Sequence, residues 1–288
     1  MSDNEKLYHY TSKKSFLKII ESKSLFATDI RFLNDGMEAD IVSRILNKLL
    51  SEDDEIKEAL GNDKFYISEF YESFKGVGSY VVSFSGKSDD LNQWRCYASN
   101  CTGICIEFNG EKLFECLKRN KYKYDSIQLN FDLQKCIYDF EDQKTIIKNL
   151  ILDYKNKSTN EKSVPNLITE LLKCSAYFKD KSFEAEDEYR LIVTNVDKSS
   201  KKARLGRNAY IPYCEVKIED SSKCPTDECE HPWLGNVIIG PNNPLSVIDS
   251  DNQFDYVLEC VRQACFINGI EFCDVTRKLE KSKIPYRG

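Results

Sequence analysis

The chain has 288 residues and a mass of 33.4 kDa, with 41% hydrophobic, 12% aromatic and 31% charged residues. This much apolar and aromatic material excludes wholesale disorder, and the composition is neither collagen-like nor that of a coiled coil. Lys and Arg number 41 and Asp and Glu 47, so the formal net charge of −6 repels a nucleic-acid backbone at long range. The sequence therefore indicates a folded chain of enzyme size.

Twelve cysteines stand against only two histidines. The N-terminal residues contain no apolar signal segment and no later window is apolar enough to span a membrane, so we expect a cytoplasmic protein with no membrane partner. In that reducing compartment, cysteines act mainly as small buried hydrophobes. The most metal-like spacing joins Cys224, Cys229 and His231, but a structural zinc needs a fourth ligand, so we predict no metal.

The first part of the chain predicts a strand followed by two helices. Residues 7–10 form a short strand-like opening, and Ser12 can cap a helix whose apolar stripe is Phe16, Leu17 and Ile20. After a polar turn comes an amphipathic helix that we expect to continue, frayed, into residues 53–74. The apolar face of this second helix consists of Ile41, Val42, Ile45, Leu46, Leu49 and Leu50.

The rest of the chain predicts further strands with helices between them. β-Branched and aromatic residues predict strands at 77–85 and 103–108, joined by a polar segment. Further strands are expected near residues 135–140, 187–195, 210–219, 236–239 and 270–275, and helices near 141–155, 164–180 and 254–266. Because the strands do not alternate strictly with helices, the sequence predicts one α+β domain over residues 1–288 with a mixed, largely antiparallel sheet.

A short basic run, KSSKKARLGR, extends from Lys198 to Arg207. A run of this kind with Ser and Gly is typical of a solvated loop. Local contact with a nucleic acid is the alternative.

An acidic run passes directly into an apolar strand near the middle of the chain. Period two places Glu186, Glu188 and Arg190 on one strand face. A carboxylate held by an adjacent Arg stays ionised and can stabilise positive charge in a transition state. The alternative is an edge strand with a solvated charged face.

His9 and Thr11, at the end of the first strand, can present two hydrogen-bonding side chains to a ligand hydroxyl. A histidine of this kind is also commonly a structural group.

A second polar and aromatic cluster, Trp94, Arg95 and Tyr97, lies between two strands. It suits stacking on a planar ring together with anion binding, although a Trp that anchors a loop to the core is an equally common arrangement.

Several well-known motifs are absent. The chain contains no GxGxxG, no GxxxxGK[ST], no HExxH and no GxSxG. Rossmann dehydrogenases, P-loop NTPases and zincins are therefore disfavoured.

In order, LYHYTS, TDIRFLNDGME, VVSFS, DDLNQWRCYA, GICIEF, FEAEDEYRLIV, VIIGP and SKIPYR resemble the motifs of a bacterial family of unknown-function domains. The resemblance covers nearly the whole chain. More remotely, the H-Y-T opening and the helix after it are similar to the start of ADP-ribosyltransferase-like domains, notably DNA-modifying toxins and RNA 2′-phosphotransferases. This resemblance implies an ADP-ribosyltransferase-like fold and NAD as the substrate.

The same resemblance implies a role for particular residues. Glu188, or Glu186 on the same face, would be the catalytic carboxylate, and Arg190 or Arg95 would meet the pyrophosphate or orient that carboxylate. Ser83 belongs to a partial stand-in for the family's second-strand motif. The implied NAD-binding residues are His9, Tyr10, Thr11, Asn34, Ser83, Trp94, Arg95 and Tyr97, with Trp94 or Tyr97 as the aromatic against nicotinamide.

The leading hypothesis is an NAD-dependent ADP-ribosyltransferase-like enzyme, a bacterial toxin or phage-defence effector, that moves ADP-ribose to a protein, a nucleic acid or water. A partner protein would regulate it. One alternative is a non-enzymatic module on the same fold that senses nucleotides or binds proteins. The other is a metal-dependent nuclease or phosphodiesterase that uses Asp35, Glu38 and Glu186.

Overall fold

The computed structural model of the chain describes residues 5–33, 38–61, 78–120, 129–156, 164–206, 209–218, 231–242, 255–272 and 277–286. The chain divides into two compact units, and each unit is assembled from separate segments. Unit 1 holds residues 1–25, 83–125 and 215–288, and unit 2 holds residues 26–82 and 126–214. The expectation of one domain over residues 1–288 stays a prediction.

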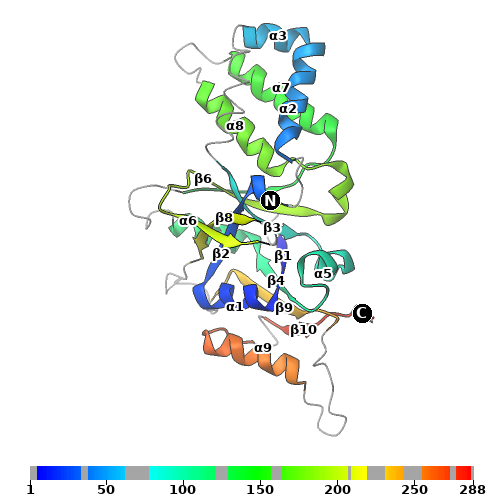
Figure 1. Cartoon of the computed structure of the whole chain (residues 1–288), viewed down its shortest axis with the longest axis vertical. Coiled ribbons are helices and arrows are strands. Elements are labelled where there is room, and N and C mark those ends of the chain that lie inside the picture. The colour runs from blue at the N-terminus through cyan, green and yellow to red at the C-terminus, as the bar shows by residue number, and fades with distance from the viewer. Residues whose placement is uncertain are drawn as a thin grey trace. The chain divides into compact units, whose positions relative to one another are not determined.

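Unit 1 contains the strands β1 (Lys6–Thr11), β4 (Ile104–Asn109), β9 (Leu234–Ile239) and β10 (Leu279–Lys281). These strands are hydrogen-bonded in the order β10, β9, β4, β1, as can be followed in Figure 1. β1 and β4 are antiparallel, β4 and β9 are antiparallel, and β9 and β10 are parallel. The end of β3 (Tyr80–Ser85) pairs with β1 through Ser85 and Tyr8.

The first helix of unit 1, α1 (Lys13–Ser22), begins as predicted. Ser12 is its N-cap, and its hydroxyl accepts a hydrogen bond of 3.1 Å from a backbone N–H in the first turn. Phe16 and Ile20 are buried, whereas Leu17 is 40% exposed. Residues four apart share a helix face and adjacent residues do not, which explains why Leu17 is absent from the buried stripe.

Two helices of unit 1 lie where the sequence pattern predicts none. α5 (Leu91–Tyr97) occupies the polar segment between two strands, and α6 (Gly110–Asn120) follows β4 directly. The carboxylate of Asp90 caps α5 by accepting backbone N–H bonds of 2.9 and 3.1 Å. α5 is short, so this cap is its clearest local signal.

The last helix, α9 (Tyr256–Ile267), confirms the helix predicted near residues 254–266. The strand predicted at 270–275 is not formed by residues 270–272, and residues 273–276 lie outside the described part of the chain.

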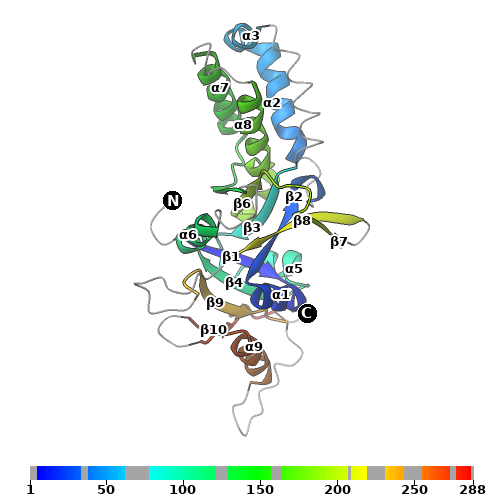
Figure 2. The same cartoon turned by 90° about the vertical axis from the view of Figure 1, so that its left-hand side faces the viewer.

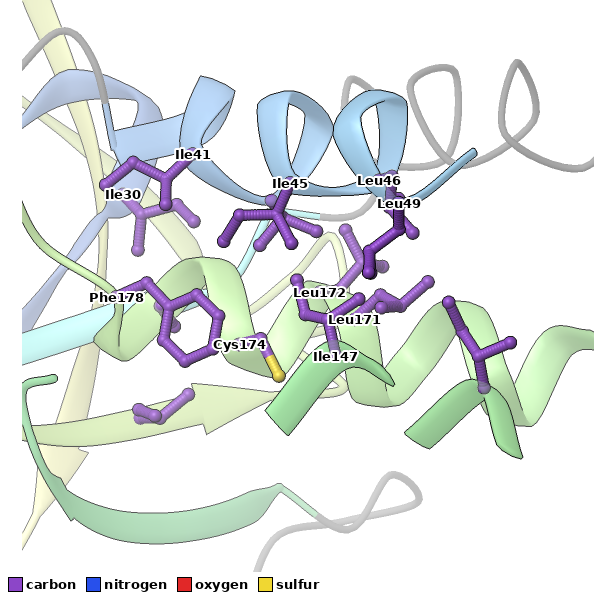
Figure 3. Close-up of a cluster of buried hydrophobic side chains, with 14 of the residues drawn as sticks. Ile30, Ile41, Ile45, Leu46, Leu49, Ile147, Leu171, Leu172, Cys174 and Phe178 are labelled. Atoms are coloured by element: carbon purple, nitrogen blue, oxygen red, sulfur yellow. The ribbon is translucent and has the colours of Figure 1, made fainter. Parts of the chain in front are cut away.

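Four helices of unit 2 form a packed group: α2 (Glu38–Glu52), α3 (Asp54–Leu60), α7 (Phe140–Asn156) and α8 (Val164–Tyr177). The predicted apolar face of α2 is buried against α7 and α8, and Figure 3 shows Ile41, Ile45 and Leu49 directed at this core. The helices predicted at 141–155 and 164–180 are confirmed. Asp53 begins α3 as a separate helix, and residues 62–77 lie outside the described residues.

The strands of unit 2 pair antiparallel. They are β5 (Asn130–Lys135) with β6 (Glu188–Thr194), β7 (Lys201–Leu205) with β8 (Tyr210–Lys217), and β2 (Ser24–Asp29) with β3. β2, β3 and β8 each also contain residues that belong to unit 1. β6 also pairs with β3, and β8 lies beside β2.

Two strand assignments in this unit correct the sequence prediction. The strand expected at 135–140 is wrong, because β5 ends at Lys135 and α7 begins at Phe140. The apolar Ile137 between them forms an isolated bridge with Phe178 instead. The basic run expected to be a solvated loop contains β7, whose five residues are all exposed.

The predicted α+β class with a mixed, largely antiparallel sheet is confirmed. An ADP-ribosyltransferase-like fold stays a proposal.

Candidate functional site

The charges predicted at the start of β6 form a buried ion cluster in unit 2. Glu188 is the first residue of β6, and Arg190 lies two residues further on the same strand face. Arg190 Nε lies 2.8 Å from Glu188 Oε1, and Nη2 lies 3.2 Å from Oε2. Glu188 is 5% exposed and Arg190 1% exposed. Because β6 pairs with both β5 and β3, the alternative of a solvated edge strand is wrong.

Lys179, which the sequence pattern does not single out, completes this cluster. Its Nζ lies 2.6 Å from Glu188 Oε2 and 2.5 Å from Glu186 Oε2. The backbone of Lys179 is also fixed: its N–H donates to the carbonyl of Ile137, and its carbonyl accepts from Gln143 Nε2 at 2.9 Å. A buried ammonium group therefore joins the two glutamates that the sequence places together.

The two glutamates that contact Lys179 belong to different secondary-structure elements. Glu186 is the last residue of the 3₁₀ helix η3 (Lys181–Glu186), whereas Glu188 already belongs to β6. Asp187 between them has a φ of 47°, in the left-handed region. Strand alternation thus applies to Glu188 and Arg190, and Glu186 joins the cluster through Lys179.

The charge state of Glu188 is set by its two cationic neighbours. Burial alone would raise its pKa, but the charges of Arg190 and Lys179, with the hydrogen bonds that they donate, lower the pKa from 4.5 to about 2. Burial acts to lower the pKa of Lys179, and its carboxylate partners raise it above its ordinary value. Glu188 is therefore an anion at neutral pH, suited to stabilising positive charge and unsuited to donating a proton.

His9 lies on β1 in unit 1 with one ring nitrogen fixed. Nδ1 is 2.9 Å from the carbonyl oxygen of Ser83, so Nδ1 carries a proton and donates it. Burial lowers the pKa of His9 and this hydrogen bond offsets the effect only in part, which leaves the ring neutral at pH 7. Nε2 is consequently an acceptor, and it makes no hydrogen bond within the described residues.

Tyr10 and Trp94 lie on the face of β1 opposite His9. Side chains alternate along a strand, and Tyr10 packs edge to face on Trp94 with ring centroids 4.9 Å apart, whereas His9 contacts Phe84. Trp94 has no exposed surface, and its Nε1–H donates to Asp89 Oδ1 at 2.7 Å. The structure does not bring Trp94 together with His9, and a fully buried ring offers no face to a ligand.

Asp89, which sequence reasoning does not single out, anchors the C-terminal segment in unit 1. Its carboxylate accepts hydrogen bonds from Ser282 Oγ at 2.7 Å and from the backbone N–H of Lys283 at 2.8 Å. Ile284 and Tyr286 pack against the buried cluster around Trp94. Residues 89–98 and 282–286, far apart in the chain, thus form one packed structure.

The remaining predicted residues of unit 1 have more varied surroundings. The guanidinium of Arg95 lies over the ring of Tyr286, 5.2 Å from its centre. Tyr97 is 37% exposed and keeps an accessible ring. Thr11 lies on the same face of β1 as His9 and is buried.

Some predicted residues cannot be placed. Asn34 and Asp35 lie outside the described residues, as do Cys224, Cys229 and the side chain of Glu38. In the described part of the chain, no group of three or more His, Cys, Asp and Glu side chains is arranged to hold a metal ion. None of the helices described is both long and apolar enough to cross a membrane.

Comparison with known proteins relates part of this chain to a family of domains. Neither the curated proteins nor the solved structures contain a match to this chain. A family model matches a segment of the chain that extends from α5 in unit 1 to β6 in unit 2. This segment includes both Trp94 and Glu188. The predicted relation to a family of unknown-function domains is confirmed for this segment: residues 93–191 match the family described as "Protein of unknown function (DUF2971)".

Proposed function

We propose that this chain is an NAD-dependent ADP-ribosyltransferase-like enzyme in which Glu188 is the catalytic carboxylate. The observation that carries the proposal is the fixed anion at the start of β6, whose pKa of about 2 keeps it charged at every physiological pH. The resemblance to ADP-ribosyltransferases implies a glutamate on a late strand in this role. NAD is the substrate.

In the proposed reaction, the bond between C1′ of the nicotinamide ribose and the pyridinium nitrogen breaks, and its electron pair leaves with neutral nicotinamide. The positive charge that develops on the ribose is stabilised by the carboxylate of Glu188. A nucleophile of a macromolecule, or water, then forms a bond to C1′ and loses a proton. This chemistry requires a permanent anion and no proton donor at Glu188.

Arg190 and Lys179 act in this proposal as positioning residues. Arg190 uses Nε and Nη2 on Glu188, and its Nη1 donates to the carbonyl of Ala176 at 3.0 Å. These contacts fix the guanidinium inside unit 2 and favour orientation of Glu188 over binding of a pyrophosphate.

His9 and Thr11 are proposed to bind the ribose hydroxyl groups of NAD. The neutral imidazole of His9 keeps Nε2 as an acceptor for a ribose hydroxyl, because Nδ1 is occupied by Ser83. Tyr97 is the better aromatic candidate for nicotinamide, because its ring is accessible and that of Trp94 is not.

The test is nicotinamide release from NAD by the purified full chain. Glu188→Gln should lower the rate by roughly 10²- to 10³-fold, as removal of an electrostatic stabiliser does. Glu184→Gln is the matched control, because Glu184 belongs to the same acidic run but is exposed and pairs with Lys181 at 3.2 Å. Thermal melting of each variant checks folding.

His9→Gln supplies a second test that does not disturb the ion cluster. We expect a raised KM for NAD with a folded protein. Absence of nicotinamide release by the unaltered chain, or unchanged turnover in the double variant Glu186→Gln/Glu188→Gln, would contradict the proposed reaction.

One observation favours the second candidate, a non-enzymatic module that senses nucleotides or binds proteins. Both carboxylate oxygens of Glu188 already accept hydrogen bonds inside a buried cluster. Under this alternative, NAD is not consumed, and a nucleotide other than NAD raises the melting temperature.

A further inference from the structure

The basic run and two aromatic rings meet on one sheet surface of unit 2. Lys202 and Arg204 of β7 pair with Tyr213 and Ile211 of β8, and cross-strand partners share a sheet face. On β2, Phe26 contacts the ring of Tyr213 with centroids 5.9 Å apart. We call this surface the basic aromatic face, and its members are Phe26, Thr28, Lys202, Arg204, Ile211 and Tyr213.

This face lies at a sheet edge. β7 is the last strand of its sheet order, and all five of its residues are exposed. Figure 2 shows β7 beside β8. The rings of Phe26 and Tyr213 are half-buried, so each keeps accessible surface. A ligand can therefore reach both the charged and the aromatic side chains.

The local charge is opposite to that of the whole chain. Lys202 and Arg204 lie on this face, whereas Lys201 alternates to the opposite face and lies over Tyr80, although the net charge of the chain is −6. A concentration of Lys and Arg on one surface is the usual electrostatic footprint of a protein that contacts phosphates.

Arg204 is held in place against an aromatic ring. Its guanidinium lies over Tyr213, 5.6 Å from the ring centre, and Nη2 donates to Thr28 Oγ1 at 2.7 Å. Guanidinium planes and aromatic rings are the groups on which unpaired nucleic-acid bases stack. Stacking of this kind needs bases that are not enclosed in a duplex.

We propose that the basic aromatic face binds single-stranded nucleic acid. Addition of a peptide strand to the β7 edge is disfavoured, because lysines on an edge strand oppose strand pairing. The inference goes beyond the proposed enzymatic function and does not depend on it, since binding is measured without NAD.

The experiment is a fluorescence anisotropy titration of labelled single-stranded DNA and RNA of about 12 nucleotides with the full chain. At about 50 mM salt we expect binding that weakens as salt rises, because counterions are released. The double variant Lys202→Gln/Arg204→Gln should bind roughly tenfold more weakly and should reduce the slope of log affinity against log salt by about 1.4, at about 0.7 per lost phosphate contact.

Matched variants distinguish the loss of a binding site from the loss of positive charge anywhere on the protein. Lys13→Gln/Lys14→Gln removes two exposed charges from α1 in unit 1 and should leave affinity and slope unchanged. Tyr213→Leu should weaken binding while keeping the salt slope, whereas Tyr256→Leu, at an exposed tyrosine of α9, should have no effect.

Two results would overturn the inference: no binding of either oligonucleotide at low salt, or equal affinities for the Lys202→Gln/Arg204→Gln and Lys13→Gln/Lys14→Gln proteins. Glu188→Gln should bind the oligonucleotides normally. The failure of NAD turnover and the failure of nucleic-acid binding are therefore distinguishable.

Discussion

Lys179 Nζ lies 2.6 Å from a carboxylate oxygen of Glu188, and both side chains are buried. Neither charge would be stable in that position alone, because the desolvation of a single buried ion is not compensated. The pair therefore makes the stability of unit 2 depend on the residues that we assign to catalysis and positioning.

Lys179→Met should destabilise the protein by about 1 to 3 kcal/mol, because Glu188 loses a charged hydrogen-bond donor in a buried site and keeps Arg190 as its cationic partner. Urea unfolding measures this loss. Lys181→Met is the control: its exposed ion pair should contribute at most about 0.5 kcal/mol. Part of the loss should be recovered in Lys179→Met/Glu188→Gln, and a fully additive double variant would contradict the coupling.

Acid should destabilise the protein partly through Glu188. Its pKa is lowered from 4.5 to about 2 in the folded chain, so its contribution to stability is complete above pH 4.5 and disappears as the pH falls toward 2. Urea unfolding at successive pH values should show a steeper decline in this window for the unaltered chain than for Glu188→Gln. Parallel curves for the two proteins would show that the pKa of Glu188 is not lowered.

Trp94→Phe should affect stability and not NAD binding. The substitution removes the indole N–H that donates to Asp89, at a cost of about 1 kcal/mol. The matched control is Trp233→Phe, at the other fully buried tryptophan. NAD should raise the melting temperature by the same amount in both variants. Loss of this increase in Trp94→Phe alone would indicate that Trp94 binds NAD.

Thiol labelling should divide the cysteines by burial. Among the nine cysteines in the described residues, Cys96 and Cys260 are exposed. Burial raises the pKa of Cys214 and Cys265 to about 12, so their thiols stay protonated and inaccessible at neutral pH. Mass spectrometry after iodoacetamide treatment should show early modification of the exposed pair, and modification of the buried pair only after unfolding. Early labelling of Cys214 would contradict this assignment.

Local signals in the sequence predict those parts of the fold that depend on neighbouring residues. The N-cap at Ser12 and the apolar stripe of α2 each need only residues within a few turns, and both are present in the structure. Local sequence patterns do not predict the strand β5, because it is polar and only Leu133 is buried along its length. Its place in the sheet follows from pairing with β6, a contact distant in sequence.

In the candidate site, too, local sequence patterns predict some contacts and miss those that depend on tertiary packing. Alternation along a strand correctly joins Glu188 to Arg190, two residues apart. Lys179 cannot be found in this way, because its role depends on burial by tertiary packing, and only its position after the apolar pair Tyr177–Phe178 distinguishes it in the sequence. The burial of Trp94 is equally nonlocal, since residues near position 284 contribute to it.

Because each unit is assembled from separate segments of the chain, few continuous fragments contain a complete unit. The chain passes from one unit to the other at residues 25–26, 82–83, 125–126 and 214–215. A fragment spanning residues 93–191, the segment that matches the family, would contain β4 without its partners β1 and β9, and β6 without β3. Such a fragment would expose unpaired strand edges and aggregate. The matched segment is thus a region of sequence likeness and not an excisable folding unit.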